Sequence, residues 1–185
     1  MKQFLIFGLG NPGSEFSHTR HNLGADMVDA WANEMMQRGN TVSDWRTHEK
    51  FHARIREVSF DEVEVTILSQ LVFMNDSGKV LSAYLRYHEL ERKNILLIHD
   101  EIELPLGDTK IQEDGSAKGH NGVRSIHEHL GDTNIPRLKI GVGRPHDTTP
   151  IEKFVLSTFT PSEKEVLKQR EAEILQIIAT RVLAA

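Results

Sequence analysis

His21 and Asp100 are the two side chains in this sequence best suited to activating a water molecule. His21 lies between a glycine-rich loop and a helical pattern, and Asp100 comes just beyond the apolar segment 94–98. Ligand crevices of open α/β sheets lie outside the carboxyl ends of the strands, so both side chains face one crevice if their strands are neighbours. A carboxylate bonded to one imidazole nitrogen keeps the other nitrogen basic. The pair therefore predicts general-base catalysis.

Three asparagines occupy corresponding loop positions at the predicted crevice. Asn11 lies in the glycine-rich loop, and the other two precede predicted helices in the motifs Phe73-Met74-Asn75 and Gly119-His120-Asn121-Gly122. An asparagine ahead of a helix often serves only as its N-cap, and that interpretation is open for both motifs. Several amides along one sheet edge also form a neutral, hydrogen-bonding crevice. Such a crevice suits a carbonyl or ester oxygen better than a phosphate or a metal ion.

The loop Gly8-Leu9-Gly10-Asn11-Pro12-Gly13 has the glycine spacing of a dinucleotide-binding fingerprint. That fingerprint needs a helix that begins at the glycines and an acidic residue after a second strand about 20 residues later. Here the helical pattern begins only near Asn22, and Glu34 falls within that helix. The hypothesis that this protein is a nucleotide-binding oxidoreductase is therefore supported only by the glycine spacing.

Other catalytic chemistries lack the residues that they need. The chain has no cysteine, which excludes thiolate nucleophiles and thiolate metal sites. It has no Gly-x-Ser-x-Gly motif to support a serine nucleophile. His127 and His129 are two positions apart on a predicted helix, so they do not face each other, and no zincin spacing occurs. We expect a reaction that requires neither a metal nor a cofactor.

Hydrophobic periodicity predicts strands and helices that alternate around this crevice. Apolar or alternating segments predict strands at 2–7, 51–55, 63–67, 94–98 and 138–142, the second and third forming a hairpin. Helical spacing and capping residues predict helices from Asn22 to Gly39, after Asn75 or Asp76, from Val123 to Gly131, and after Thr160. The segment 104–119 is predicted to be irregular. We expect an α/β fold: a single domain over 1–185, with a twisted, mixed, mainly parallel sheet flanked by helices on both faces.

The composition is that of an ordinary globular protein. Of its 185 residues, 38% are apolar and 26% are charged, which excludes a disordered or fibrous class. No apolar run approaches the roughly 20 residues that span a bilayer, and the first residues lack signal-peptide flanks, so we expect a cytoplasmic protein. The net charge of −5 argues, on composition alone, against a nucleic-acid partner.

Five sequence blocks together resemble the bacterial-type peptidyl-tRNA hydrolase family. They occur in family order and spacing at 8–13, 19–22, 73–79, 99–101 and 119–122, and the resemblance extends over about 2–182. It implies a monomeric α/β enzyme that hydrolyses the ester between a peptide and the 3′ ribose of tRNA. It also implies a cytoplasmic enzyme with no cofactor and no obligatory protein partner, whose substrate is peptidyl-tRNA.

The resemblance also implies a role for each matching residue. His21 is the general base, and Asp100 stabilises its basic form. Asn11 binds the substrate near the scissile bond and helps to distinguish N-blocked aminoacyl groups from free ones. Contacts to the peptide and to the 3′ end of the tRNA fall on Phe73, Asn75 and Asn121, with Phe16 where the family commonly has tyrosine.

The sequence departs from the family where tRNA phosphate is bound. The family commonly has glycines ahead of the last block, whereas this chain has the more acidic and stiffer segment 113–118. Gln112 and Lys139 occupy the positions of a family lysine and arginine, and lysine cannot make the bidentate phosphate contact of arginine. We expect reduced tRNA affinity and salt dependence, with these remaining cationic candidates: Lys110, Lys118, Arg137, Lys139 and Arg144.

The motifs outweigh the net charge, but the charge still limits the interface. Segment 134–153 carries four Lys/Arg against two Asp/Glu, whereas 100–121 carries six acids against two bases. Phosphate contacts should therefore be few and confined to a small patch. The alternative function is a non-catalytic RNA-binding protein on the same fold, because organelle relatives of the family serve RNA splicing.

Overall fold

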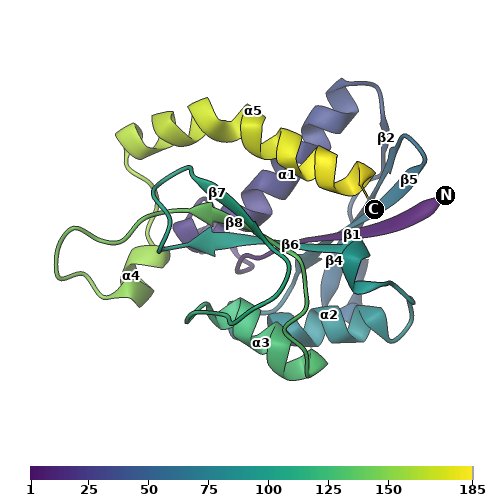
Figure 1. Ribbon diagram of the computed structural model, residues 1–185, viewed down its shortest axis with the longest axis horizontal. Coiled ribbons are helices and arrows are strands. Elements are labelled where there is room, and N and C mark those ends of the chain that lie inside the picture. The colour runs from purple at the N-terminus through teal and green to yellow at the C-terminus, as the bar shows by residue number, and fades with distance from the viewer. Residues whose placement is uncertain (185) are drawn as a thin grey trace.

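The chain folds into three layers, with one mixed sheet between two groups of helices (Figure 1). The computed structural model describes residues 1–184. The strands are β1 (Lys2–Gly8), β2 (Thr41–Val42), β3 (Arg46–His48), β4 (Ala53–Phe60), β5 (Val63–Gln70), β6 (Ile95–Glu101), β7 (Thr109–Gln112) and β8 (Arg137–Gly141). The helices are α1 (Leu23–Gln37), α2 (Ser77–Leu85), α3 (Asn121–Leu130), α4 (Ile151–Val155) and α5 (Pro161–Leu183).

The sheet has the strand order β2-β4-β5-β1-β6-β8-β7, and β3 pairs with β4 outside this path. The four central strands β5, β1, β6 and β8 are parallel to one another. The hairpin β4–β5 and the pairs β2–β4, β3–β4 and β7–β8 are antiparallel. This confirms the predicted mixed sheet with its inserted hairpin. The neighbouring strands β1 and β6 bring the two chain segments of the predicted crevice to one sheet edge.

Alternating side chains of β1 divide the core into two clusters. Phe4 and Ile6 pack on one face against α1 and α5, while Leu5 and Phe7 pack on the other against α2 and α3 (Figure 1). Successive side chains of a strand point to opposite faces, so a short apolar run such as β1 must be covered on both sides. The helices on both faces of the sheet are therefore confirmed.

Helix ends follow the predicted capping residues. Gly39 has a φ of +87° and lies two residues beyond α1, where its N–H bonds the carbonyl of Met36 and the N–H of Asn40 bonds that of Met35. These are the two hydrogen bonds of a Schellman motif, which favours glycine at this left-handed position. Thr160 and Glu163 form the predicted capping box at the start of α5.

Several of the predicted element boundaries are wrong. The strand predicted at 51–55 is β4, Ala53–Phe60, and α3 begins at Asn121 rather than at Val123. The strand predicted to end at residue 98 continues as β6 through Asp100 to Glu101, because these positions pair with β8. The segment 104–119, predicted to be irregular, contains β7, which pairs antiparallel with β8. The short elements β2, β3 and α4 were not predicted, since two to five residues are too few to show a hydrophobic period.

Within residues 1–184, no helix has both the length and the apolar character required to cross a membrane.

Candidate active site

A buried arginine fixes the backbone at His21. His21 lies in the 3₁₀ turn Arg20–Asn22 that leads into α1. The guanidinium of Arg20 donates to both carboxylate oxygens of Glu163, at 3.0 and 2.7 Å, and to the carbonyl of Thr158 at 3.0 Å. It also lies 4.2 Å from the ring centroid of Phe154. These contacts tie the turn that carries His21 to the start of α5 and the end of α4.

Asp100 accepts hydrogen bonds from two imidazoles. His21 Nδ1 lies 3.0 and 3.1 Å from its two oxygens, and His120 Nε2 lies 2.9 Å from Oδ1. Burial alone raises the pKa of Asp100, but the two imidazoles, His120 foremost, outweigh burial and hold that pKa far below its ordinary range. Asp100 is therefore ionised, and an ionised carboxylate only accepts hydrogen bonds.

The contacts of Asp100 decide which nitrogen of each imidazole carries the proton. His21 must donate from Nδ1, which leaves the lone pair of a neutral imidazole on Nε2. His120 must donate from Nε2, and its Nδ1 accepts from the backbone N–H of Val123 at 3.3 Å. The carboxylate thus holds His21 in the tautomer that presents a basic nitrogen away from Asp100.

His99 is a third histidine of this cluster, and its role was not predicted. Its Nδ1 donates to the backbone carbonyl of Asp100 at 2.7 Å, and its ring meets that of His120 edge-on with centroids 4.6 Å apart. Burial lowers the pKa of His99 well below its ordinary value. A neutral His99 packs against His120 without adding a positive charge beside Asp100.

Two substitutions of His120 should separate the effect of its contact with Asp100 from that of its cap on α3. In His120→Asn the side chain still caps α3 but no longer reaches Asp100, so we expect turnover to fall about two- to tenfold and the melting temperature to fall only through the lost contact with Asp100. His120→Ala should show the same fall in turnover and be about 1 kcal/mol less stable than His120→Asn, because it also loses the cap. Wild-type turnover in both variants would contradict a positioning role for His120.

Asn11 is held so that its amide nitrogen is left for a ligand. Its backbone N–H donates to Asn22 Oδ1 at 2.8 Å, and Asn22 Nδ2 donates to its carbonyl at 2.9 Å. The side-chain oxygen of Asn11 accepts from the N–H of Met74 at 2.7 Å. Because that N–H is a donor, the atom that faces it must be oxygen. Two N–H donors of Asn11 remain, and no other described residue bonds them.

A cleft of about 400 Å³ gathers the predicted residues. It is lined by six of them, Asn11, Phe16, His21, Phe73, Asn75 and Asn121, while Asp100 lies buried behind His21. Phe16 and Phe73 meet edge-on with ring centroids 5.9 Å apart and form an apolar wall. The sequence missed the other lining residues, Met74, Glu152, Val155 and Leu156. The last three come from α4 and its end, an element too short to predict.

Helix capping does not account for Asn75 or Asn121. Asp76 is the N-cap of α2, and His120 is the N-cap of α3. Asn121 Oδ1 instead accepts from Arg124 Nη2 at 2.9 Å. The capping interpretation is therefore wrong for both asparagines, and their amides lie at the cleft.

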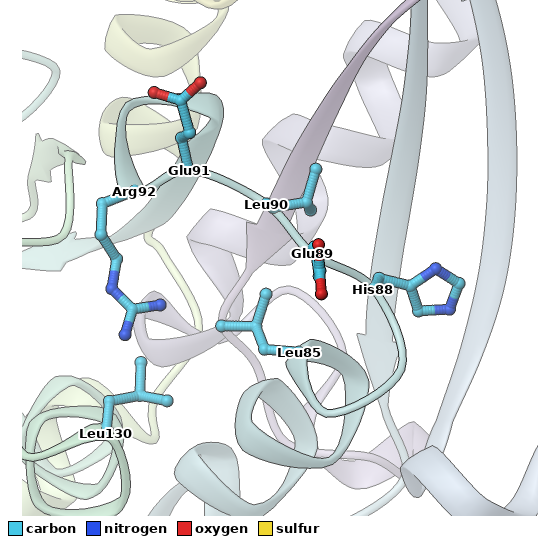
Figure 2. A pocket seen from close by; sticks show the side chains of 7 residues that line it. All are labelled: Leu85, His88, Glu89, Leu90, Glu91, Arg92 and Leu130. Carbon is cyan, nitrogen blue, oxygen red and sulfur yellow. The ribbon is translucent and has the colours of Figure 1, made fainter.

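Another hollow of about 560 Å³ lies where α2 and α3 end and shares no residue with the cleft. Figure 2 shows that its side chains come from the end of α2, the following loop and the end of α3. Its charged side chains, Glu89, Glu91 and Arg92, are flanked mainly by leucines. None of the predicted catalytic residues lies there.

Two of the predicted phosphate-binding cations are buried in structural contacts. Arg137 is 0% exposed and donates to the carbonyls of Gly115 and Ser116 at 2.8 and 3.2 Å. Lys139 forms an ion pair with Glu101 and donates to Gln112 Oε1 at 3.2 Å. The prediction of Arg137 and Lys139 as cationic candidates for phosphate contact is therefore wrong, because β8 places both side chains inside the protein.

The other three candidates, Lys110, Lys118 and Arg144, are exposed. Arg144 forms an ion pair with Glu103. The acidic segment 113–118 is held at its beginning, by Glu113 to Arg181 at 2.9 Å and by Asp114 to Thr133 at 2.7 Å. These contacts agree with the expectation of a stiff segment at this place.

The residues of the histidine cluster also resemble a small metal site. The side chains of His21, Asp100 and His120 offer ligand atoms that all lie within 4.8 Å of one another. However, the nitrogens that face Asp100 carry the protons that bond it, and a cation there would have to displace both. Metal-independent chemistry remains a prediction, which a chelator tests.

The fold and the site together define a class of protein, an α/β enzyme equipped for hydrolysis. An imidazole oriented by a buried carboxylate lies at a cleft whose other polar groups are mainly neutral amides. That arrangement suits attack of water on an acyl carbon.

Comparisons with known proteins name the family. The sequence profile described as Peptidyl-tRNA hydrolase matches residues 5–184. The chain is 38% identical over 165 residues to the peptidyl-tRNA hydrolase of Dichelobacter nodosus, covering 89% of this chain and 84% of that protein. It is 39% identical over 166 residues to that of Clostridium botulinum, covering 90% and 82%.

A solved structure agrees with these relatives. The crystal structure of peptidyl-tRNA hydrolase from Acinetobacter baumannii superposes with a TM-score of 0.87 at 30% identity, covering 98% of this chain and 89% of that one. The chain belongs to the peptidyl-tRNA hydrolase family.

Proposed function

We propose that this protein hydrolyses the ester that joins a peptide to the 3′ ribose of tRNA, and so returns free tRNA to translation. The observation that carries the proposal is the contact of His21 Nδ1 with the buried carboxylate of Asp100, at 3.0 and 3.1 Å, beside the amide-lined cleft. Membership of the family supplies the substrate class.

His21 acts as the general base in this proposal. Its Nε2 takes a proton from a water molecule, whose oxygen bonds to the ester carbon. The bond from that carbon to the ribose 3′ oxygen then breaks, and the proton on His21 passes to this oxygen. Asp100 stabilises the imidazolium that exists between the two proton transfers.

The amides and aromatic rings of the cleft position the substrate. Asn11 donates from Nδ2 to the substrate near the scissile bond, and this donor favours an N-blocked aminoacyl group. Asn75 and Asn121 contact the peptide and the 3′ end of the tRNA. Phe16 and Phe73 supply an apolar wall, and phenylalanine in place of the family's tyrosine at position 16 removes one hydroxyl.

We also propose that residues 1–185 act as one domain, as a monomer in the cytoplasm, without an obligatory protein partner. The three-layer fold, in which the cleft is lined from the beginning, middle and last third of the chain, supports a single functional unit. Sedimentation at working concentration tests the monomer.

The decisive assay compares blocked with unblocked substrate. We expect the purified protein to release the acyl group from N-acetyl-aminoacyl-tRNA in the presence of a chelator, and to spare the unblocked aminoacyl-tRNA. When the salt concentration is raised, KM should increase only modestly, because few exposed cations face phosphate. The value of kcat should not change. Tight tRNA binding without ester hydrolysis would instead favour the non-catalytic RNA-binding alternative, which no observation supports at present.

A further inference from the structure

One carboxylate lines the cleft. Apart from His21, the lining side chains within residues 1–184 are amides, aromatic rings, aliphatic groups or the thioether of Met74, with the single exception of Glu152. Glu152 is exposed, and within residues 1–184 its side chain forms no hydrogen bond or ion pair. Its charge is therefore available to whatever occupies the cleft.

The position of Glu152 is fixed relative to His21. Glu152 lies in the first turn of α4, and the same segment contributes Val155 and Leu156 to the cleft. Arg20, the neighbour of His21, holds the end of α4 through the ring of Phe154 and the carbonyls that follow it. The turn Arg20–Asn22 and the part of α4 that lines the cleft are therefore held in a fixed relative position.

A peptidyl-tRNA has a polyanionic end and a peptide end, and a carboxylate in the cleft interacts differently with the two. Its carboxylate repels phosphates, so the tRNA end should lie away from the α4 wall. On the α3 side, the cleft residue Asn121 accepts from Arg124, an exposed cation, and Lys118 is exposed just before it. Arg124 also pairs with Glu128 at 3.9 Å, and Lys153 on α4 is exposed but does not line the cleft. Within the cleft itself, the charge of Glu152 therefore favours the peptide along α4.

We propose that Glu152 makes this cleft selective for the charge of the peptide, favouring a basic over an acidic side chain on the residue esterified to tRNA. The inference rests on the proposed function and names the substrate class within it. An exposed ion pair is worth up to about 1 kcal/mol, which corresponds to about a fivefold preference. Because the attraction acts equally on the bound substrate and the transition state, the preference appears in KM rather than in kcat.

The test uses one tRNA acylated in turn with N-acetyl-lysine, N-acetyl-glutamine and N-acetyl-glutamate. For the wild-type protein we expect kcat/KM to decrease in that order, by about three- to tenfold from lysine to glutamate. The lysine-to-glutamate ratio should fall to about one in Glu152→Gln and invert in Glu152→Lys. Higher salt should reduce the wild-type ratio, because screening weakens exposed charge pairs.

Glu165 provides the matched control, since it is an exposed glutamate on α5 that does not line the cleft. Glu165→Gln should keep the wild-type ratio. An unchanged ratio in Glu152→Gln, equal wild-type constants for all three substrates, or an effect confined to kcat would each overturn the role of Glu152. If the wild-type protein hydrolyses none of the three esters, the proposed function itself is wrong.

Discussion

Replacing His21 by alanine should lower kcat by a factor of roughly 100 to 10,000, the contribution typical of a positioned general base. His21 Nδ1 is bound to Asp100, and the residue lines the cleft, so alanine removes the proton acceptor without disturbing the wall formed by Phe16 and Phe73. Initial rates on N-acetyl-aminoacyl-tRNA measure the change. KM should change little, because the amides that bind substrate remain.

His18 is the control for this substitution. It lies three residues earlier, its side chain is 77% exposed, and it does not line the cleft. His18→Ala should retain wild-type kcat. Circular dichroism should show both variants folded, and full activity of a folded His21→Ala protein would remove His21 from the mechanism.

Replacing Asp100 by asparagine should cost less, about 10- to 150-fold in kcat. Both histidine donors approach Oδ1, at 3.0 and 2.9 Å, so an amide oxygen at that position can still accept from both, although the amide nitrogen would then stand where Oδ2 now lies 3.1 Å from His21 Nδ1. What asparagine removes is the negative charge and the second acceptor oxygen, and a hydrogen bond to a charged group is worth about 1.5–3 kcal/mol. Asp108→Asn, at an exposed carboxylate that pairs with Arg170, is the control and should have no effect.

The pH dependence of kcat/KM distinguishes an electrostatic role of Asp100 from a purely geometric one. The pKa of Asp100 is depressed, so its stabilising contribution is present above the ordinary carboxyl pKa and is lost only as pH falls through the still lower folded-state value. Protonation of Asp100 therefore does not set the acid limb of kcat/KM. In Asp100→Asn that limb should move to lower pH, because the imidazolium loses the anion that stabilises it. If the acid limb of Asp100→Asn stays at the wild-type pH while kcat is reduced, the role of Asp100 is purely geometric.

Several features of this protein were decided by the sequence on its own. Local periodicity predicted the central strands and the principal helices, because a helix or strand that covers a core must repeat its apolar residues every 3.6 or 2 positions. Gly39 and the Thr160–Glu163 box marked helix ends for equally local reasons. Residue type and position at a strand end or ahead of a helix also predicted His21, Asp100 and the three asparagines as candidate site residues.

The tertiary structure decided which of these groups meet. His21 and Asp100 are 79 residues apart, and only the adjacency of β1 and β6 joins them. The same packing placed His120 on Asp100 and brought Glu152 to the cleft from the unpredicted α4. It also buried Lys139 against Glu101, removing a cation that the sequence had offered to phosphate. Residue type and period are local properties, whereas contact and burial depend on strand order and on what pairs across the sheet.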